Sequence, residues 1–246
     1  MALAALVGRR VMRAVILFDI DATLVLSGGA GLRGLNRAFE EELQIQGACT
    51  GVALPGRTDR AILAEVLARV GIPHDDELEA RLRDRYCECL LEDIRRPNPT
   101  KGVLPGVTAL LDTLAEREDV SVGLLTGNFF EAARIKLEYF ALWHHFPFGA
   151  FGGDALDRRD LFHVALRRVT AVCSRSFIAS QVIVVGDTPL DIECARAAGA
   201  TSVAVATGTF DEESLRAAGA DVALRDLTDA AAVLRVIDRV SASRPT

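Results

Sequence analysis

The stretch AVILFDIDATL, residues 14–24, joins an apolar run directly to two aspartates that stand one residue apart. An apolar run without polar alternation is typical of a strand buried on both faces of a parallel sheet. A carboxylate at the end of such a strand is costly unless it is paired, hydrogen-bonded or bound to a metal ion. Asp19 and Asp21 therefore direct attention to the end of the first strand.

Further apolar runs predict a parallel sheet that is covered by helices on both faces. The runs that predict strands are 14–18, 121–125, 182–185 and 202–206, with weaker ones near 148–151 and 222–225. The helical patterns between them cover 106–117, 129–142, 159–172, 189–198 and 211–218. This alternation predicts the α/β class, with a doubly wound, Rossmann-like parallel sheet.

The segment after the first strand breaks this alternation. It has helical patterns near 30–46, 58–70 and 75–94, and it lies between a glycine-rich stretch and a stretch rich in proline, asparagine and glycine. We interpret residues 27–102 as an inserted helical cap domain. Residues 12–26 and 103–240 then form the α/β core domain.

Composition narrows the class of protein. The net charge of −6 and the absence of a basic tract argue against binding to nucleic acid or to anionic lipid. The apolar patch at the start of the chain is too short to span a membrane and lacks the charged lead of a signal peptide. Together with scattered cysteines, these features predict a cytoplasmic protein. The oligomeric state stays open.

Polar residues follow three of the predicted strands, and the carboxyl ends of parallel strands are where ligands bind. These residues are Asp19 and Asp21, then Thr126, Gly127 and Asn128, then Asp187 and Asp191. Four acids at one sheet edge would repel one another, and a divalent cation such as Mg²⁺ removes that repulsion. Helix capping alone is an alternative explanation for Asp191, which follows Thr188 and Pro189 at the third helical position.

Three segments together resemble motifs of the haloacid dehalogenase-like superfamily. They are FDIDATL (18–24), LLTGN (124–128) and VVGDTPLDIECARAAGA (184–200), in the family's order. The helical insertion stands where this superfamily carries its cap. The segments GRTDRAIL (56–63) and FGAFGGD (148–154) are similar to the phosphoglycolate-phosphatase-like branch.

The resemblance implies a Mg²⁺-dependent phosphatase that acts on a small phosphorylated metabolite through an aspartyl phosphate. It implies that Asp19 is the nucleophile and that Asp21 is the general acid and base, whose backbone carbonyl also binds the metal. Asp187 and Asp191 would be further metal ligands. Thr126, Gly127 and Asn128 would hold the phosphoryl oxygens and the substrate.

Two positions depart from the family pattern. Ala22 stands where glycine is usual, which matters if the backbone there needs a positive φ. The third motif usually has a lysine, but the chain has only Lys101 and Lys136, so Arg158 or Arg159 must supply that cation, and the register favours Arg158.

Arg57, Thr58 and Asp59 are the candidates for substrate contacts from the cap. Thr58 or Asp59 could instead simply cap the helix that follows. The alternatives to a phosphatase are a phosphomutase on the same scaffold, which a demand for a bisphosphate activator would reveal, and a catalytically inactive binding module. A dinucleotide site would rest only on GAGLRG (29–34), which lies too far beyond the first strand.

Overall fold

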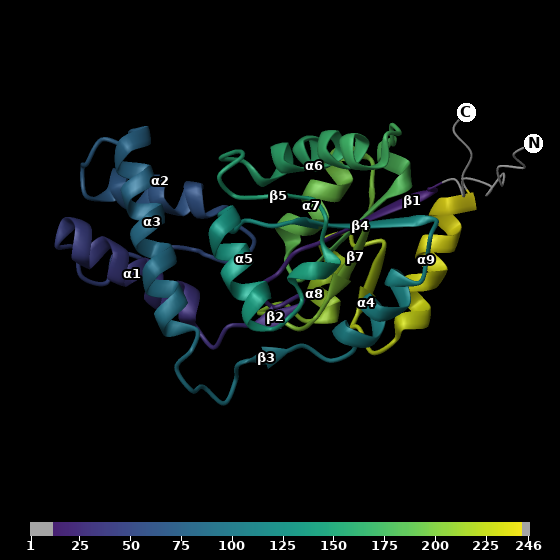
Figure 1. The fold of residues 1–246 in the computed structure, drawn as a ribbon, viewed down its shortest axis with the longest axis horizontal. Coiled ribbons are helices and arrows are strands. Elements are labelled where there is room, and N and C mark those ends of the chain that lie inside the picture. The colour runs from purple at the N-terminus through teal and green to yellow at the C-terminus, as the bar shows by residue number, and fades with distance from the viewer. Residues whose placement is uncertain (1–11, 243–246) are drawn as a thin grey trace, which may run out of the picture.

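The structure is a computed structural model that describes residues 12–242. A six-stranded parallel sheet runs through its larger part (Figure 1). The segment before Met12 lies outside the described residues. The sheet has the order β5-β4-β1-β6-β7-β8. Its strands are β1 (Ala14–Phe18), β4 (Val120–Leu125), β5 (Gly149–Ala150), β6 (Val182–Gly186), β7 (Thr201–Val205) and β8 (Val222–Leu224). The predicted α/β fold class is confirmed.

Alternate residues of β1 face opposite layers of helices, as the two-residue period of a strand requires. Ile16 and its neighbours on that face pack with α4 (Val107–Ala115), α5 (Phe130–Tyr139) and α9 (Ala230–Ala242). Leu17 and its neighbours on the other face pack with α6 (Arg158–Cys173) and α7 (Pro189–Ala198). Two short 3₁₀ helices, Trp143–His145 and Ala179–Gln181, and α8 (Glu212–Ala217) complete this part.

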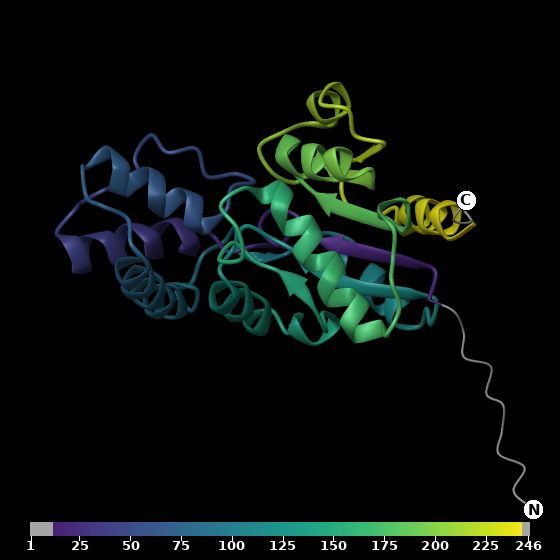
Figure 2. The ribbon, with the colours of Figure 1, turned by 90° about the horizontal axis from the view of Figure 1, so that it is seen from above.

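Three further helices lie at one end of the molecule, beside the sheet rather than over it (Figures 1 and 2). They are α1 (Ala30–Leu43), α2 (Asp59–Arg69) and α3 (Asp76–Asp93). They pack around an apolar cluster of their own, which Phe129 and Ala132 join from the sheet side. We call α1–α3 and their connections the helical insertion.

Two features of the fold were not predicted. A short antiparallel pair, β2 (Val25–Leu26) with β3 (Gly102–Val103), joins the two connections to the helical insertion. Helix α9 follows the last strand, and its buried face belongs to the core of the sheet. The weak strand near 148–151 is shorter than expected, because only Gly149 and Ala150 pair with β4.

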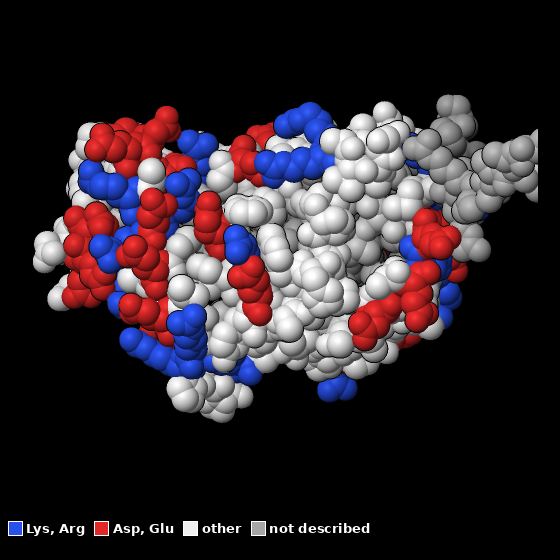
Figure 3. All heavy atoms as spheres, in the orientation of Figure 1, with Lys and Arg blue, Asp and Glu red and all other residues white. Residues whose placement is uncertain are grey.

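Charged side chains gather over the helical insertion, with both signs intermixed (Figure 3). They pair between its helices, as Arg60 does with Glu79 and Arg85 with Glu42. Within residues 12–242, no helix has the length and apolarity that crossing a membrane would take.

Candidate active site

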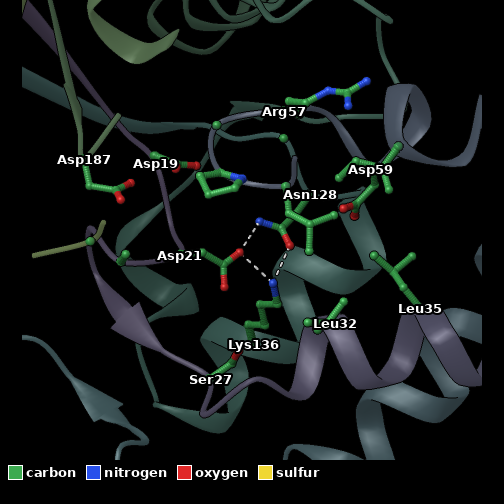
Figure 4. Close-up of a pocket in the computed structure, with 18 of the residues that line it drawn as sticks. Asp19, Asp21, Ser27, Leu32, Leu35, Arg57, Asp59, Asn128, Lys136 and Asp187 are labelled. Carbon is green, nitrogen blue, oxygen red and sulfur yellow. Dashed lines mark hydrogen bonds and ion pairs between the residues drawn. The ribbon is translucent and has the colours of Figure 1, made fainter. Parts of the chain in front are cut away.

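The three predicted motifs meet at one edge of the sheet because β4, β1 and β6 are neighbours. Asp19 follows β1, Thr126 follows β4 and Asp187 follows β6. Figure 4 shows Asp19, Asp21, Asn128 and Asp187 around one cavity of about 240 Å³. A cavity of this size accommodates a small ligand only.

A cluster of three buried acids forms one wall of the site. Carboxylate oxygens of Asp19, Asp187 and Asp191 lie within 4.8 Å of one another. Burial raises the pKa of Asp19 to about 6 and that of Asp187 to about 8, and the neighbouring carboxylates add to both shifts. Positive charge nearby would therefore stabilise the ionised forms.

The acid cluster fits a divalent cation. Its donors are carboxylate oxygens, which Mg²⁺ prefers, and their number leaves room for water and phosphate as further ligands. The backbone at Gly208 approaches the cluster so closely that a Cβ atom there would lie 1.9 Å from Oδ2 of Asp187. The backbone of Gly208 therefore lies directly beside this carboxylate.

Arg158 is the cation that faces Asp19. Its guanidinium lies 3.3 Å from Oδ1 of Asp19 and also pairs with Asp191. It is fixed by hydrogen bonds to the carbonyl oxygens of Gly56 and Leu125, at 2.9 and 3.1 Å. The neighbouring Arg159 is exposed and pairs with Asp157 and Glu193. Of the two arginines, the structure therefore brings Arg158 to the site.

Asp191 is engaged in two local contacts. Its Oδ2 accepts hydrogen bonds from the backbone nitrogen of Thr188, at 3.0 Å, and from the Thr188 hydroxyl, at 2.7 Å. Its Oδ1 pairs with Arg158. The capping contact anticipated for Asp191 is thus present, and the same carboxylate also belongs to the acid cluster.

A buried lysine that the sequence analysis did not select completes the site. Nζ of Lys136, on α5, lies 2.6 Å from Oδ2 of Asp21 and 2.6 Å from Oδ1 of Asn128. The amide nitrogen of Asn128 donates to the same Oδ2 of Asp21 at 2.8 Å. Figure 4 shows this triangle of contacts. The sequence does contain one indication of this role, because the helical period of 129–142 places the charged Lys136 on the buried face of the helix.

Thr126 and Gly127 lie between this triangle and the helical insertion. The hydroxyl of Thr126 is fully buried and accepts a hydrogen bond from the side-chain amide of Asn128 at 2.9 Å. The carbonyl of Gly127 accepts from the nitrogen of Asp59 at 2.6 Å. A Cβ atom at Gly127 would lie 1.9 Å from the carbonyl oxygen of Arg57, so the two backbones are in direct contact.

The three residues proposed for the cap take different positions. Thr58 caps α2 by accepting from Ala61, and its hydroxyl also bonds the carbonyl of Leu156. Asp59 is buried, its Oδ2 accepts from the nitrogen of Phe129, and burial raises its pKa to about 7. The guanidinium of Arg57 pairs with Glu65 and points away from Asp19 and Asp21 (Figure 4).

The backbone at Ala22 has a φ of 57°, in the left-handed region. Alanine is therefore strained at this position, where glycine would not be, because its methyl group is crowded by the backbone at a positive φ.

Comparisons with known proteins agree with the fold. Residues 16–205 match the profile of the haloacid dehalogenase-like hydrolases. The chain is 29% identical to a phosphoglycolate phosphatase of Rhodospirillum rubrum over 85% of this chain and 86% of that protein. It is 28% identical to a phosphoglycolate phosphatase of Caulobacter vibrioides, over 88% of each.

The crystal structure of a hydrolase from Pseudomonas syringae has the same fold. It superposes with a TM-score of 0.65 over 91% of this chain and 99% of that one, at 24% identity. The names of the curated relatives agree with the predicted enzyme class, a phosphoric monoester hydrolase.

Proposed function

The chain belongs to the haloacid dehalogenase-like hydrolases, and from this membership and the geometry of its site we propose that it is a Mg²⁺-dependent phosphatase of small metabolites. The observation that carries the proposal is the position of Asp19, which belongs to the acid cluster, pairs with Arg158 and stands two residues before Asp21. The relatives named phosphoglycolate phosphatase support a small phosphorylated substrate.

Asp19 is the proposed nucleophile. Its carboxylate attacks phosphorus, a new bond forms between its oxygen and phosphorus, and the ester bond to the leaving oxygen breaks. Arg158 stabilises the charge on Asp19 and on the transferred group. A Mg²⁺ ion held by Asp19, Asp187, Asp191 and the carbonyl of Asp21 would neutralise the remaining negative charge of the carboxylates and of the phosphoryl group.

Asp21 is the proposed general acid and base. Its proton passes to the leaving oxygen, so that a neutral alcohol departs. The same carboxylate then takes a proton from the water that attacks the aspartyl phosphate, which releases phosphate and restores Asp19. Lys136 and Asn128 both contact Oδ2 of Asp21, and this leaves Oδ1 to carry the proton.

Thr126 and the amide of Gly127 are proposed to hold the phosphoryl oxygens, and Asn128 is a proposed substrate-binding residue. The hydroxyl of Thr126 accepts from Asn128 and therefore keeps its own proton for a further hydrogen bond. Residues 27–102 are proposed to act as a cap domain that excludes water from the site. Direct contact between the backbones of Arg57 and Gly127 supports this role.

The test is hydrolysis of p-nitrophenyl phosphate and phosphoglycolate by the purified protein, with Mg²⁺ or with EDTA. We expect turnover that needs the metal and disappears in Asp19→Asn. Asp84→Asn, at an exposed position on α3, is the matched control and should keep full activity. Turnover that survives Asp19→Asn would contradict the proposed nucleophile, and turnover only with a bisphosphate activator would indicate a phosphomutase.

A further inference from the structure

The cavity has an apolar half on the side of the helical insertion. Its walls there come from all three helices and the loop before α2, and they are Leu32, Leu35, Leu54, Pro55, Ile62 and Tyr86. In Figure 4, Leu32 and Leu35 lie on α1 across from Lys136 and Asn128. Because the phosphoryl group is held at the sheet edge, this apolar half faces the alcohol part of a bound ester.

The cations that line the cavity already have partners. Within the described residues, they are Arg57, Lys136 and Arg158. Arg158 pairs with Asp19 and Asp191, at the phosphoryl end.

The two other cations have partners of their own. Lys136 contacts Asp21 and Asn128. Arg57 pairs with Glu65, and its guanidinium points away from the cavity centre (Figure 4).

Acidic groups also line this side. Asp59 is buried beside the cavity, and Asp21 lies at the border between its two halves. A carboxylate on the substrate would therefore lie beside two carboxyl groups, and the nearest cation, Lys136, is already hydrogen-bonded to Asp21 and Asn128. An anionic group in such surroundings is disfavoured, because it loses water and gains no cation of its own.

We infer that this site selects phosphate monoesters whose alcohol part is uncharged and at least partly apolar, and that it disfavours phosphoglycolate. The inference rests on the proposed phosphatase function and specifies the substrate class of the same site. It separates this chain from the relatives whose name is phosphoglycolate phosphatase.

A pair of esters that differ only in charge tests the inference directly. Phosphoglycolate and its amide, carbamoylmethyl phosphate, have nearly the same shape, and propyl phosphate adds an apolar alcohol of similar size. We expect kcat/KM for the amide and for propyl phosphate to exceed that for phosphoglycolate by about tenfold or more, since an unpaired buried charge is strongly rejected. Equal or higher kcat/KM for phosphoglycolate would overturn the inference.

Hydrolysis of p-nitrophenyl phosphate by the same preparation distinguishes a wrong substrate class from a wrong proposed function. If none of the esters is hydrolysed, the phosphatase itself is wrong. If p-nitrophenyl phosphate is hydrolysed but phosphoglycolate has a higher kcat/KM than its amide, only the substrate class is wrong. The inferred substrate class is also overturned if the protein hydrolyses p-nitrophenyl phosphate but neither the amide nor propyl phosphate.

A matched pair of variants adds a test within the protein. Leu32 and Val70 are both partly exposed, at 42% and 44%, but only Leu32 lines the cavity. Leu32→Arg supplies the missing cation and should raise the ratio of kcat/KM for phosphoglycolate over its amide by about tenfold. Val70→Arg should leave that ratio unchanged. An unchanged ratio in Leu32→Arg would overturn the inference.

Discussion

At the residue scale, the strained backbone at Ala22 makes a clear prediction about stability. Glycine fits a φ of 57° without strain, so Ala22→Gly should leave the free energy of unfolding unchanged or raise it. The same substitution within helix α2, Ala64→Gly, should lower that free energy by about 1 kcal/mol. Urea denaturation of both variants checks this. Equal losses in the two variants would show that Ala22 is not strained.

Lys136 makes a second prediction at this scale. Lys136→Met removes the ammonium from Asp21 and from Asn128, so both side chains lose the contact that orients them. We expect kcat for p-nitrophenyl phosphate to fall by about 10- to 100-fold, which is less than most of the range for losing acid–base catalysis outright, because Asp21 itself remains. Steady-state kinetics at saturating Mg²⁺ measures the change.

The other lysine supplies the control for this prediction. Lys101→Met removes contacts to the backbone carbonyls of Ile94 and Arg96, away from the cavity. Its kcat should stay within about twofold of the wild type, because most substitutions away from a site act on stability only. If the two variants lose activity equally, the contact between Lys136 and Asp21 does not contribute to catalysis.

The contrast between Asp187 and Lys136 shows what sequence alone could predict at this scale. Asp187 follows an apolar strand, so its position at the sheet edge follows from topology. Lys136 comes from the last turn of α5, and its long side chain reaches Asp21, beyond the end of β1. Periodicity places the residue on a buried face but does not say which charge it meets.

At the scale of elements, close backbone contacts fix the loop before α2 against the sheet. A Cβ atom at Gly152 would lie 1.8 Å from the carbonyl oxygen of Gly127 and 3.1 Å from the nitrogen of Asp59. Gly152→Ala must therefore separate the backbone at Gly152 from that of Gly127 and crowd the start of α2. We expect a higher KM, a lower kcat and a loss of about 1–3 kcal/mol in stability, as for other overpacked sites.

Gly102→Ala is the matched control for this substitution. Gly102 lies in β3, and a Cβ atom there has no heavy atom within 4 Å. Kinetics and thermal unfolding of this variant should resemble the wild type. A wild-type KM in Gly152→Ala would mean that the loop moves aside without affecting the site.

The predicted elements have a local sequence pattern, and the unpredicted pair β2 and β3 does not. Strands such as β1 and β6 are continuous apolar runs, which a buried parallel sheet requires. The pair β2 and β3 has two residues in each strand, and these come from distant parts of the chain. No local pattern specifies such a pairing. Helix α9 does carry a helical period, at Val233, Val236, Ile237 and Val240, and that signal was overlooked.

At the scale of the whole molecule, helix α5 links the two apolar clusters. Ala132 packs with the helical insertion, whereas Ala133 and Leu137 pack with the sheet. Lys136 lies on the same helix and contacts Asp21. Packing of the insertion and the geometry of the site are therefore coupled through one rigid element.

Among residues 12–242, three buried acids have raised pKa values, and at the scale of the whole molecule they set an unusual dependence of stability on pH. Burial raises the pKa of Asp19, Asp59 and Asp187 to about 6, 7 and 8, above the ordinary value of 3.8. Between pH 3.8 and its own raised pKa, each of these acids keeps its proton in the folded protein but has lost it in the unfolded chain. Without divalent cations, each acid therefore removes up to about 1.4 kcal/mol of stability per pH unit as pH rises.

Urea unfolding in EDTA should therefore show stability that falls between about pH 5 and pH 8. Excess Mg²⁺ should reduce that fall, because a cation that binds the folded state favours the ionised forms of Asp19 and Asp187. Asp187→Asn should flatten the curve in EDTA and remove most of the response to Mg²⁺, whereas Asp84→Asn, at an exposed position, should change neither. Stability that rises with pH in EDTA would mean that these carboxylates ionise freely in the folded protein, and the electrostatic argument for a cation at this sheet edge would fail.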